Sequence, residues 1–103
     1  MKVYRYEDRN HCGPFQHAGL NRRFAQLPTA QDVGLPHGNG YASACTDIGT
    51  LVKYFGTNNC NDMERMGYRI AEYETTEYLT AVDQLVFNTG SAKFIGWDDE
   101  DDE

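Results

Sequence analysis

Histidine and cysteine side chains are the first candidates for chemistry in this sequence, because both can bind zinc. There are three of each, namely His11, His17, His37, Cys12, Cys45 and Cys60. The sequence has no C-x2-C pair, and therefore no H-x3–5-H pair that follows one, although His11 and His17 are six positions apart. We therefore predict no metal site. The odd number of widely spaced cysteines predicts reduced thiols rather than a disulfide framework.

Cys45 is the candidate nucleophile, because it lies just before the start of a predicted helix. A helix N-terminus favours the thiolate, and the histidines of the preceding segment could supply a general base. However, no sequence typical of a nucleophile elbow surrounds this cysteine. Free cysteine is commonly a buried residue, so we predict a structural thiol here.

Acidic residues are concentrated at the end of the sequence, where Trp97 is followed by DDEDDE. The formal net charge is −7, but residues 1–97 carry nine Lys+Arg against ten Asp+Glu. Six adjacent like charges repel one another and have nothing to pack against, so we expect residues 98–103 to form a flexible tail. This tail could be a solubilising terminus, or it could compete for a basic surface on a partner.

Length and composition predict one globular domain, residues 1–97, with a packed core. The chain has 103 residues, of which 40% are hydrophobic and 13% aromatic. No apolar run approaches the roughly 20 residues that span a bilayer. The N-terminal residues also lack the apolar region of a signal peptide. We therefore expect a cytoplasmic protein that has no membrane partner.

Stretches rich in β-branched and aromatic residues predict four strands. They are residues 2–7, 68–74, 84–88 and 92–97. In the first strand, Val3 and Arg5 should point to one face, and Tyr4 and Tyr6 to the other. The sequence NTGS between the last two strands predicts that they form a hairpin.

Apolar residues at helical spacing predict two short helices. The first lies within residues 43–56, where Ser43 or Thr46 should cap its start and Gly56 should end it. The second covers residues 61–67.

Residues 8–40 show no clear period, so we expect a long ordered loop with a helical turn or two at 21–27. Runs of strands separated from helices in this way predict an α+β domain. We expect a mostly antiparallel sheet with the two helices packed on it.

Three segments, VYRYE, CTDIGTLVKYF and DQLVF, resemble in their order the skeleton of small ADP-ribosyltransferase-like domains. In that family an Arg or His on the first strand holds NAD, and a Ser/Thr strand shapes the pocket. A late E-x-E or Q-x-E strand carries the catalytic glutamate. The resemblance implies that Arg5 holds NAD and that Ser43 or Thr46 lines the pocket.

Gln84 departs from this pattern, because it stands where the glutamate is expected and Asp83 is its only acidic neighbour. An amide cannot supply the negative charge that stabilises an oxocarbenium-like transition state. We therefore expect no bound cofactor and no efficient catalysis, and an ADP-ribosyltransferase-like enzyme or a degenerate relative is the alternative reading.

The segments YRYED, CGPF, GYRIAEYE and QLVF together are similar to small proteins of phages and prophages. Many such proteins inhibit host defence, and anti-CRISPR proteins are among them. This resemblance implies a protein that blocks a host protein or ribonucleoprotein complex without binding nucleic acid directly.

Acids and tyrosines of the second half of the chain are the predicted contacts for such a partner. They are Glu72, Glu74, Glu77, Tyr73, Tyr78, Asp98, Asp99 and Glu100. A phage structural or assembly protein that self-associates through aromatic residues is a further reading.

Overall fold

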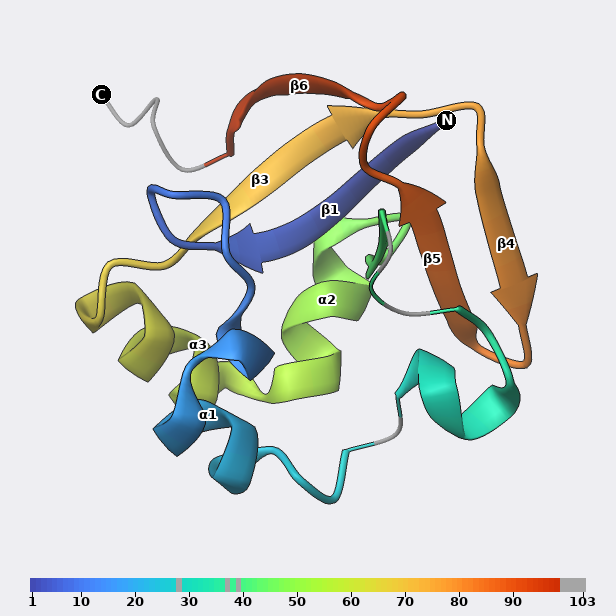
Figure 1. Ribbon diagram of the computed structural model, residues 1–103. Coiled ribbons are helices and arrows are strands. Elements are labelled where there is room, and N and C mark those ends of the chain that lie inside the picture. Colours follow the sequence, from blue (N-terminus) through green and yellow to red (C-terminus); the bar gives the residue numbers. More distant parts are fainter. Residues whose placement is uncertain (28, 37, 39, 99–103) are drawn as a thin grey trace.

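The computed structural model describes residues 1–27, 29–36, 38 and 40–98, and these have the predicted α+β fold (Figure 1). Within them, six strands form two antiparallel three-stranded sheets. The first sheet has the order β1 (Lys2–Glu7), β3 (Arg69–Glu74), β6 (Lys93–Trp97). The second has the order β2 (Tyr41–Ser43), β5 (Gln84–Asn88), β4 (Tyr78–Ala81).

The four predicted strands are confirmed, but the hairpin between the last two is wrong. β5 pairs with β2 and β4, whereas β6 pairs with β3 in the other sheet. Asn88 explains the change of direction, because its side-chain oxygen accepts hydrogen bonds from Gly90 N (2.9 Å) and Ser91 N (3.3 Å). This Asx-type turn leads the chain away from β5 and toward the first sheet.

The segment expected as a loop, residues 8–40, contains a short α-helix, α1 (Ala18–Arg23), and two 3-10 helices. The 3-10 helices are η1 (Pro14–Gln16) and η2 (Ala30–Val33). Leu20 is the buried residue of α1. A six-residue helix that buries so little leaves no apolar period in the sequence, so this part of the prediction was incomplete.

The two predicted helices are present with different starts, as α2 (Ile48–Phe55) and α3 (Thr57–Arg65). The proposed caps of the first helix were wrong, because Asp47 is the N-cap and its carboxylate accepts from Thr50 N at 2.7 Å. Gly56 ends α2 as predicted. Its φ of 92° and ψ of 145° lie in a region that only glycine adopts readily, and α3 begins at the next residue.

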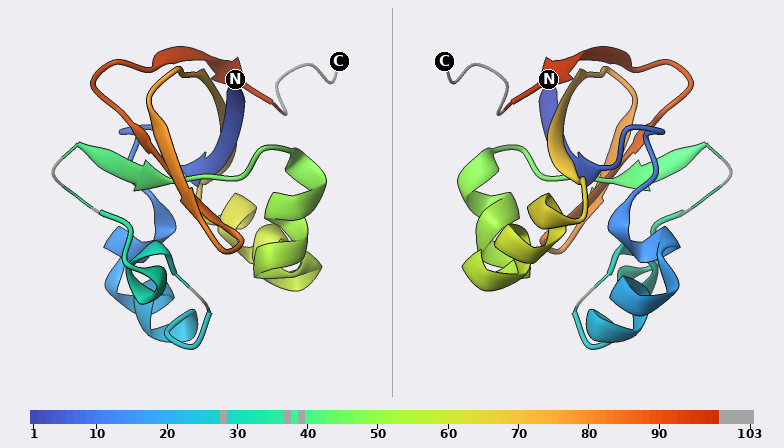
Figure 2. Two further views of the ribbon diagram at one scale, coloured as in Figure 1. Left: turned by 90° about the vertical axis from the view of Figure 1, so that its right-hand side faces the viewer. Right: turned by 90° about the vertical axis from the view of Figure 1, so that its left-hand side faces the viewer.

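The first sheet lies between the helices and the second sheet. One face packs on the helices through Tyr6, Ile70 and their neighbours, and α2 and α3 lie together on one side of α1 (Figure 2). The other face packs on the second sheet through Val3, Tyr73 and Phe87. The alternation predicted for the first strand is therefore confirmed, since Val3 and Tyr6 belong to different clusters. Arg5 and Glu7 follow Val3 at every second position of β1.

The backbone of Gly56 gives a test of the link between α2 and α3. Gly56→Ala should destabilise the protein by about 1–3 kcal/mol, because alanine is strained at this φ and ψ. Gly49→Ala is the matched control. Its Cβ would meet only Asp47 Oδ1 at 3.4 Å, so we expect unchanged or higher stability. Equal destabilisation of the two variants in urea unfolding would contradict this assignment.

Candidate functional site

Arg5 is a buried cation in the middle of β1, with only 16% of its side chain exposed. Its Nε lies 3.3 Å from Glu7 Oε2. This buried Nε has no hydrogen-bond partner among the described residues. Burial lowers the pKa of Arg5, and the nearby charge of Glu7 opposes that change. Glu7 therefore supplies the opposite charge that a buried guanidinium needs, but it accepts no hydrogen bond from Nε.

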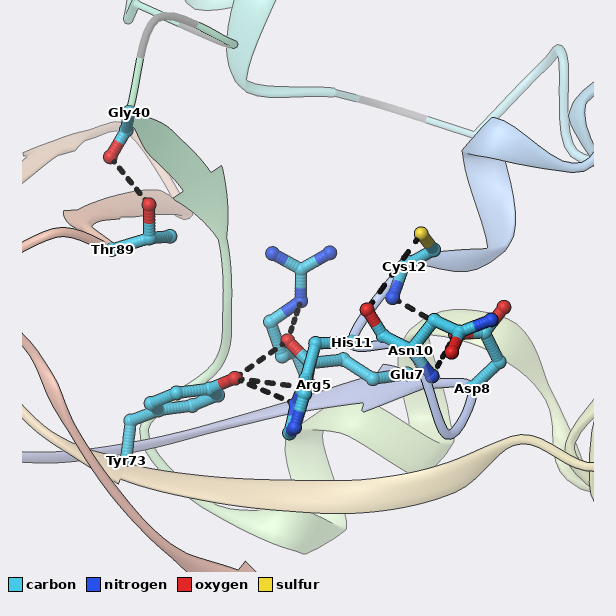
Figure 3. A network of polar contacts seen from close by, with 9 residues as sticks. All are labelled: Arg5, Glu7, Asp8, Asn10, His11, Cys12, Gly40, Tyr73 and Thr89. Atoms are coloured by element: carbon cyan, nitrogen blue, oxygen red, sulfur yellow. Dashed lines mark hydrogen bonds and ion pairs between the residues drawn. The ribbon is translucent and has the colours of Figure 1, made fainter.

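Glu7 is the buried anion beside Arg5, with 3% of its side chain exposed. The Tyr73 hydroxyl donates to its carboxylate, at 2.9 Å from Oε1 and 3.0 Å from Oε2. His11 Nδ1 lies 2.8 Å from Oε1 (Figure 3). Burial and the Glu7 charge raise the pKa of Tyr73, so this hydroxyl keeps its proton. Three side chains from β1, β3 and the loop after β1 therefore satisfy one buried carboxylate.

The loop after β1 holds His11 in an uncommon conformation, with a φ of 64°. Asp8 stabilises this loop, because its carboxylate accepts from the backbone N–H groups of Asn10 (2.8 Å) and Cys12 (3.0 Å). The imidazole stacks on Trp97 with ring centres 5.3 Å apart and an angle of 14°. These contacts fix the imidazole against Glu7.

A cavity of about 670 Å³ adjoins Arg5. Its walls come from β1, β2, α2, the segment before α1 and the start of β5. Arg5, Ser43, Asp83 and Gln84 all line it, although they lie far apart in the sequence. These are the residues that the ADP-ribosyltransferase resemblance implies, apart from Thr46, which is not a lining residue. In Figure 3 the outer nitrogens of Arg5 point away from Glu7 and Tyr73.

Gly13 leaves room for the Arg5 guanidinium. A Cβ atom at this position would come within 2.3 Å of Arg5 Nη2, which is shorter than any tolerated contact. The CGPF segment therefore keeps one wall of the cavity free of side-chain atoms at Arg5. The sequence shows that a glycine stands at position 13. It does not show that this glycine lies against Arg5, because the two residues come together only in the fold.

A second cavity of about 410 Å³ lies on the other side of Glu7. Its lining is polar and includes Glu7, Asp8, Arg9, His11, Arg69 and Trp97. Glu7 lines this second cavity, whereas its ion-pair partner Arg5 lines the first. Sequence reasoning missed this arrangement, although the alternation in VYRYE places Arg5 and Glu7 on one face of the strand.

Cys45 has the properties of a structural thiol, although it lines the larger cavity. Burial, followed by the charge of Asp47, raises the pKa of Cys45 to about 11. The thiol is therefore protonated at neutral pH and is a poor nucleophile. All three cysteines are free. Within the described residues, no three His, Cys, Asp or Glu side chains gather as a group that could hold a metal ion.

The structure describes six of the residues predicted to contact a partner, and one of them lies in the core. Tyr73 is buried, so its side chain packs in the core. Glu72 pairs with Lys2 Nζ at 3.1 Å, and Glu74 pairs with the N-terminal amine at 2.6 Å. The amine lowers the pKa of Glu74.

The remaining described contacts are Glu77, Tyr78 and Asp98. Glu77 accepts a hydrogen bond from the Ser91 hydroxyl. Tyr78 on β4 is 40% exposed. The backbone N–H of Asp98 donates to Ile70 O at 2.8 Å. Asp99, Glu100 and the rest of the predicted tail lie outside the described residues.

Comparison with known proteins shows the family to which the chain belongs. A family model described as "Bacteriophage T4 Y00F protein" matches residues 1–99. The chain therefore belongs to this phage protein family, and the predicted resemblance to small phage proteins is confirmed. No curated protein and no solved structure matches the chain significantly. Among the described residues, no helix has the length and apolar character needed to cross a membrane.

The contact between Tyr73 and Glu7 can be tested by removing one hydroxyl. Tyr73→Phe should destabilise the protein by about 1.5–3 kcal/mol, because a buried carboxylate loses a donor. Tyr78→Phe is the control, since that side chain is on the surface, and we expect a change below about 0.5 kcal/mol. Urea unfolding measures both variants. A neutral effect of Tyr73→Phe would show that Glu7 does not depend on this bond.

Proposed function

We propose that this phage protein is an ADP-ribosyltransferase-like domain that binds a nicotinamide dinucleotide in the cavity beside Arg5. The observation that carries the proposal is the buried Arg5 guanidinium, which lines the cavity and whose outer nitrogens point away from Glu7 (Figure 3). A phosphate group offers a guanidinium acceptor oxygens in matching geometry. The cavity of about 670 Å³ also has the size of a small-molecule site.

The lining of the cavity suits a ligand with flat rings, hydroxyl groups and phosphates. Phe15, Tyr54 and Phe55 supply aromatic surface. Ser43 and Gln84 supply hydrogen-bonding groups of the kind that recognise ribose hydroxyls. In addition to Arg5, Lys53 of α2 is a second cation that lines the cavity. A dinucleotide combines these groups in one molecule.

Gln84 limits the chemistry that the cavity can perform. In ADP-ribosyl transfer, the bond between nicotinamide and C1′ of the ribose breaks, and nicotinamide leaves with the bonding electrons. An acceptor nucleophile then forms a bond to C1′ and loses its proton. A carboxylate stabilises the positive charge that develops on the ribose, which the Gln84 amide cannot do. Asp83 is the carboxylate at the same wall. We therefore assign binding to this cavity and expect transfer to be slow.

Calorimetry with NAD⁺ tests this assignment. The wild-type protein should bind NAD⁺, and Gly13→Ala should weaken binding about tenfold or more, because the added methyl group displaces the Arg5 guanidinium. Gly90→Ala is the control, since Gly90 lies in the turn after β5 and does not line the cavity. Gln84→Glu should increase the release of nicotinamide. No heat of binding with the wild-type protein would refute the proposal.

A second candidate function, inhibition of a host defence complex, has one observation in its favour. β4 lies at the edge of the second sheet (Figure 1). The strand and the turn after it expose apolar side chains. Tyr78 is 40% exposed, Leu79 is 45% exposed and Val82 is 84% exposed. Exposed apolar patches mark interaction sites, and tyrosine is enriched among the residues that carry binding energy.

A plaque assay tests this second candidate. Expression of the wild-type protein in cells with active CRISPR interference should raise the number of plaques of a targeted phage. The double variant Tyr78→Ser, Leu79→Ser should remove the effect, because it removes apolar contact area at β4. Lys93→Ser on β6 of the other sheet is the control. Equal plaque numbers with and without the wild-type protein would exclude this activity against that system.

A further inference from the structure

Glu7 lies between Arg5, which lines the larger cavity, and His11, which lines the smaller cavity. Glu7 Oε2 faces Arg5 Nε at 3.3 Å, and Arg5 lines the larger cavity. Glu7 Oε1 faces His11 Nδ1 at 2.8 Å, and His11 lines the smaller cavity with 46% of its side chain exposed. One buried anion therefore contacts a cation on one side and a titratable group on the other (Figure 3).

We infer that Glu7 and His11 are positioning residues for Arg5, and that an anionic ligand in the larger cavity is bound together with a proton at His11. This inference rests on the proposed function, because it describes how the same site is regulated. In addition to the proposed function, it states that the protonation of the His11 imidazole, outside the larger cavity, depends on whether the ligand is bound.

The physical basis is competition for the charge of Arg5. In the absence of ligand, the Arg5 guanidinium compensates the buried Glu7 carboxylate at 3.3 Å. A ligand phosphate at the outer nitrogens of Arg5 shares that charge. The negative charge of the buried Glu7 carboxylate is then less well compensated, and this favours a second cation next to it. Histidine is the side chain that gains a positive charge near neutral pH, and His11 is already within hydrogen-bond distance of Glu7.

The other groups around His11 do not compete for this role. From β3, the Tyr73 hydroxyl lies 3.3 Å from Nδ1, and its raised pKa keeps it neutral. From β6, the neighbours are the rings of Phe94 and Trp97, which do not titrate. The charged residues that line the same cavity are Asp8, Arg9 and Arg69. Aspartate and arginine side chains keep their charge between about pH 6 and pH 7.5.

Thermodynamic linkage gives the direction of the effect. If ligand binding favours the protonated form of His11, protonation of His11 must favour ligand binding by the same factor. The affinity should therefore rise as the pH falls through the range in which histidine titrates. The pyrophosphate of the dinucleotide keeps its charge over that range, so the change belongs to the protein.

Calorimetric titration of the full-length protein with NAD⁺ tests the inference. At about pH 6 the affinity should be about three to ten times higher than at about pH 7.5. Titrations at one pH in two buffers with different ionisation enthalpies should reveal uptake of a fraction of a proton for each NAD⁺ bound. This measurement needs only the wild-type protein.

Two histidine variants assign the proton to one residue. His11→Asn keeps a side-chain donor for Glu7, and asparagine tolerates the φ of 64°. This variant should bind NAD⁺ with the same affinity at both pH values. His17→Asn is the control, because His17 caps α1 and asparagine is also a good N-cap. It should keep the pH dependence of the wild-type protein.

The outcomes separate the inference from the proposed function. Binding of NAD⁺ with equal affinity at both pH values and no proton uptake would overturn the inference alone. Retention of the pH dependence in His11→Asn would also overturn it. Absence of NAD⁺ binding to the wild-type protein at both pH values would overturn the proposed function and this inference with it.

Discussion

The buried Glu7 carboxylate is the constraint on which the rest of the site depends. A carboxylate with 3% exposure loses its hydration, so it is tolerated only when hydrogen bonds and an opposite charge compensate for that loss. Tyr73 supplies the hydroxyl, Arg5 the positive charge and His11 the imidazole. Each of these side chains is therefore fixed by the requirement to satisfy Glu7. The direction in which the Arg5 side chain points is therefore a consequence of its ion pair with Glu7.

The division into two sheets explains how residues from distant parts of the chain reach one cavity. β1 contributes Arg5, β2 contributes Ser43, and the start of β5 contributes Gln84. A single sheet containing a β5–β6 hairpin would have placed these strands in a different order. Because β5 lies between β2 and β4 and pairs with β2, its first residue, Gln84, lines the same cavity as Ser43. The topology therefore determines the composition of the cavity.

Local sequence patterns were sufficient to predict the strands with strong alternation and the position of Gly56, because these features depend on nearest neighbours in the chain. They were not sufficient for β4, where all three residues Tyr78, Leu79 and Thr80 are exposed and no apolar face marks a strand. They also failed for the partners of Glu7, since the Tyr73 hydroxyl joins residues 66 positions apart. Arg5, Asp83 and Gln84 were named from a resemblance, and their shared cavity became visible only with the fold.

The turn between β4 and β5 adds one more property to this region. Val82 has a φ of 56°, a left-handed conformation that β-branched residues rarely adopt, and its side chain is almost fully in water. The residue therefore contributes little packing and costs about 1–3 kcal/mol of conformational energy. Such a position is the natural first choice for engineering a more heat-resistant form of the protein, since asparagine or glycine suits this backbone. The substitution would leave the polar groups of the cavity wall chemically unchanged.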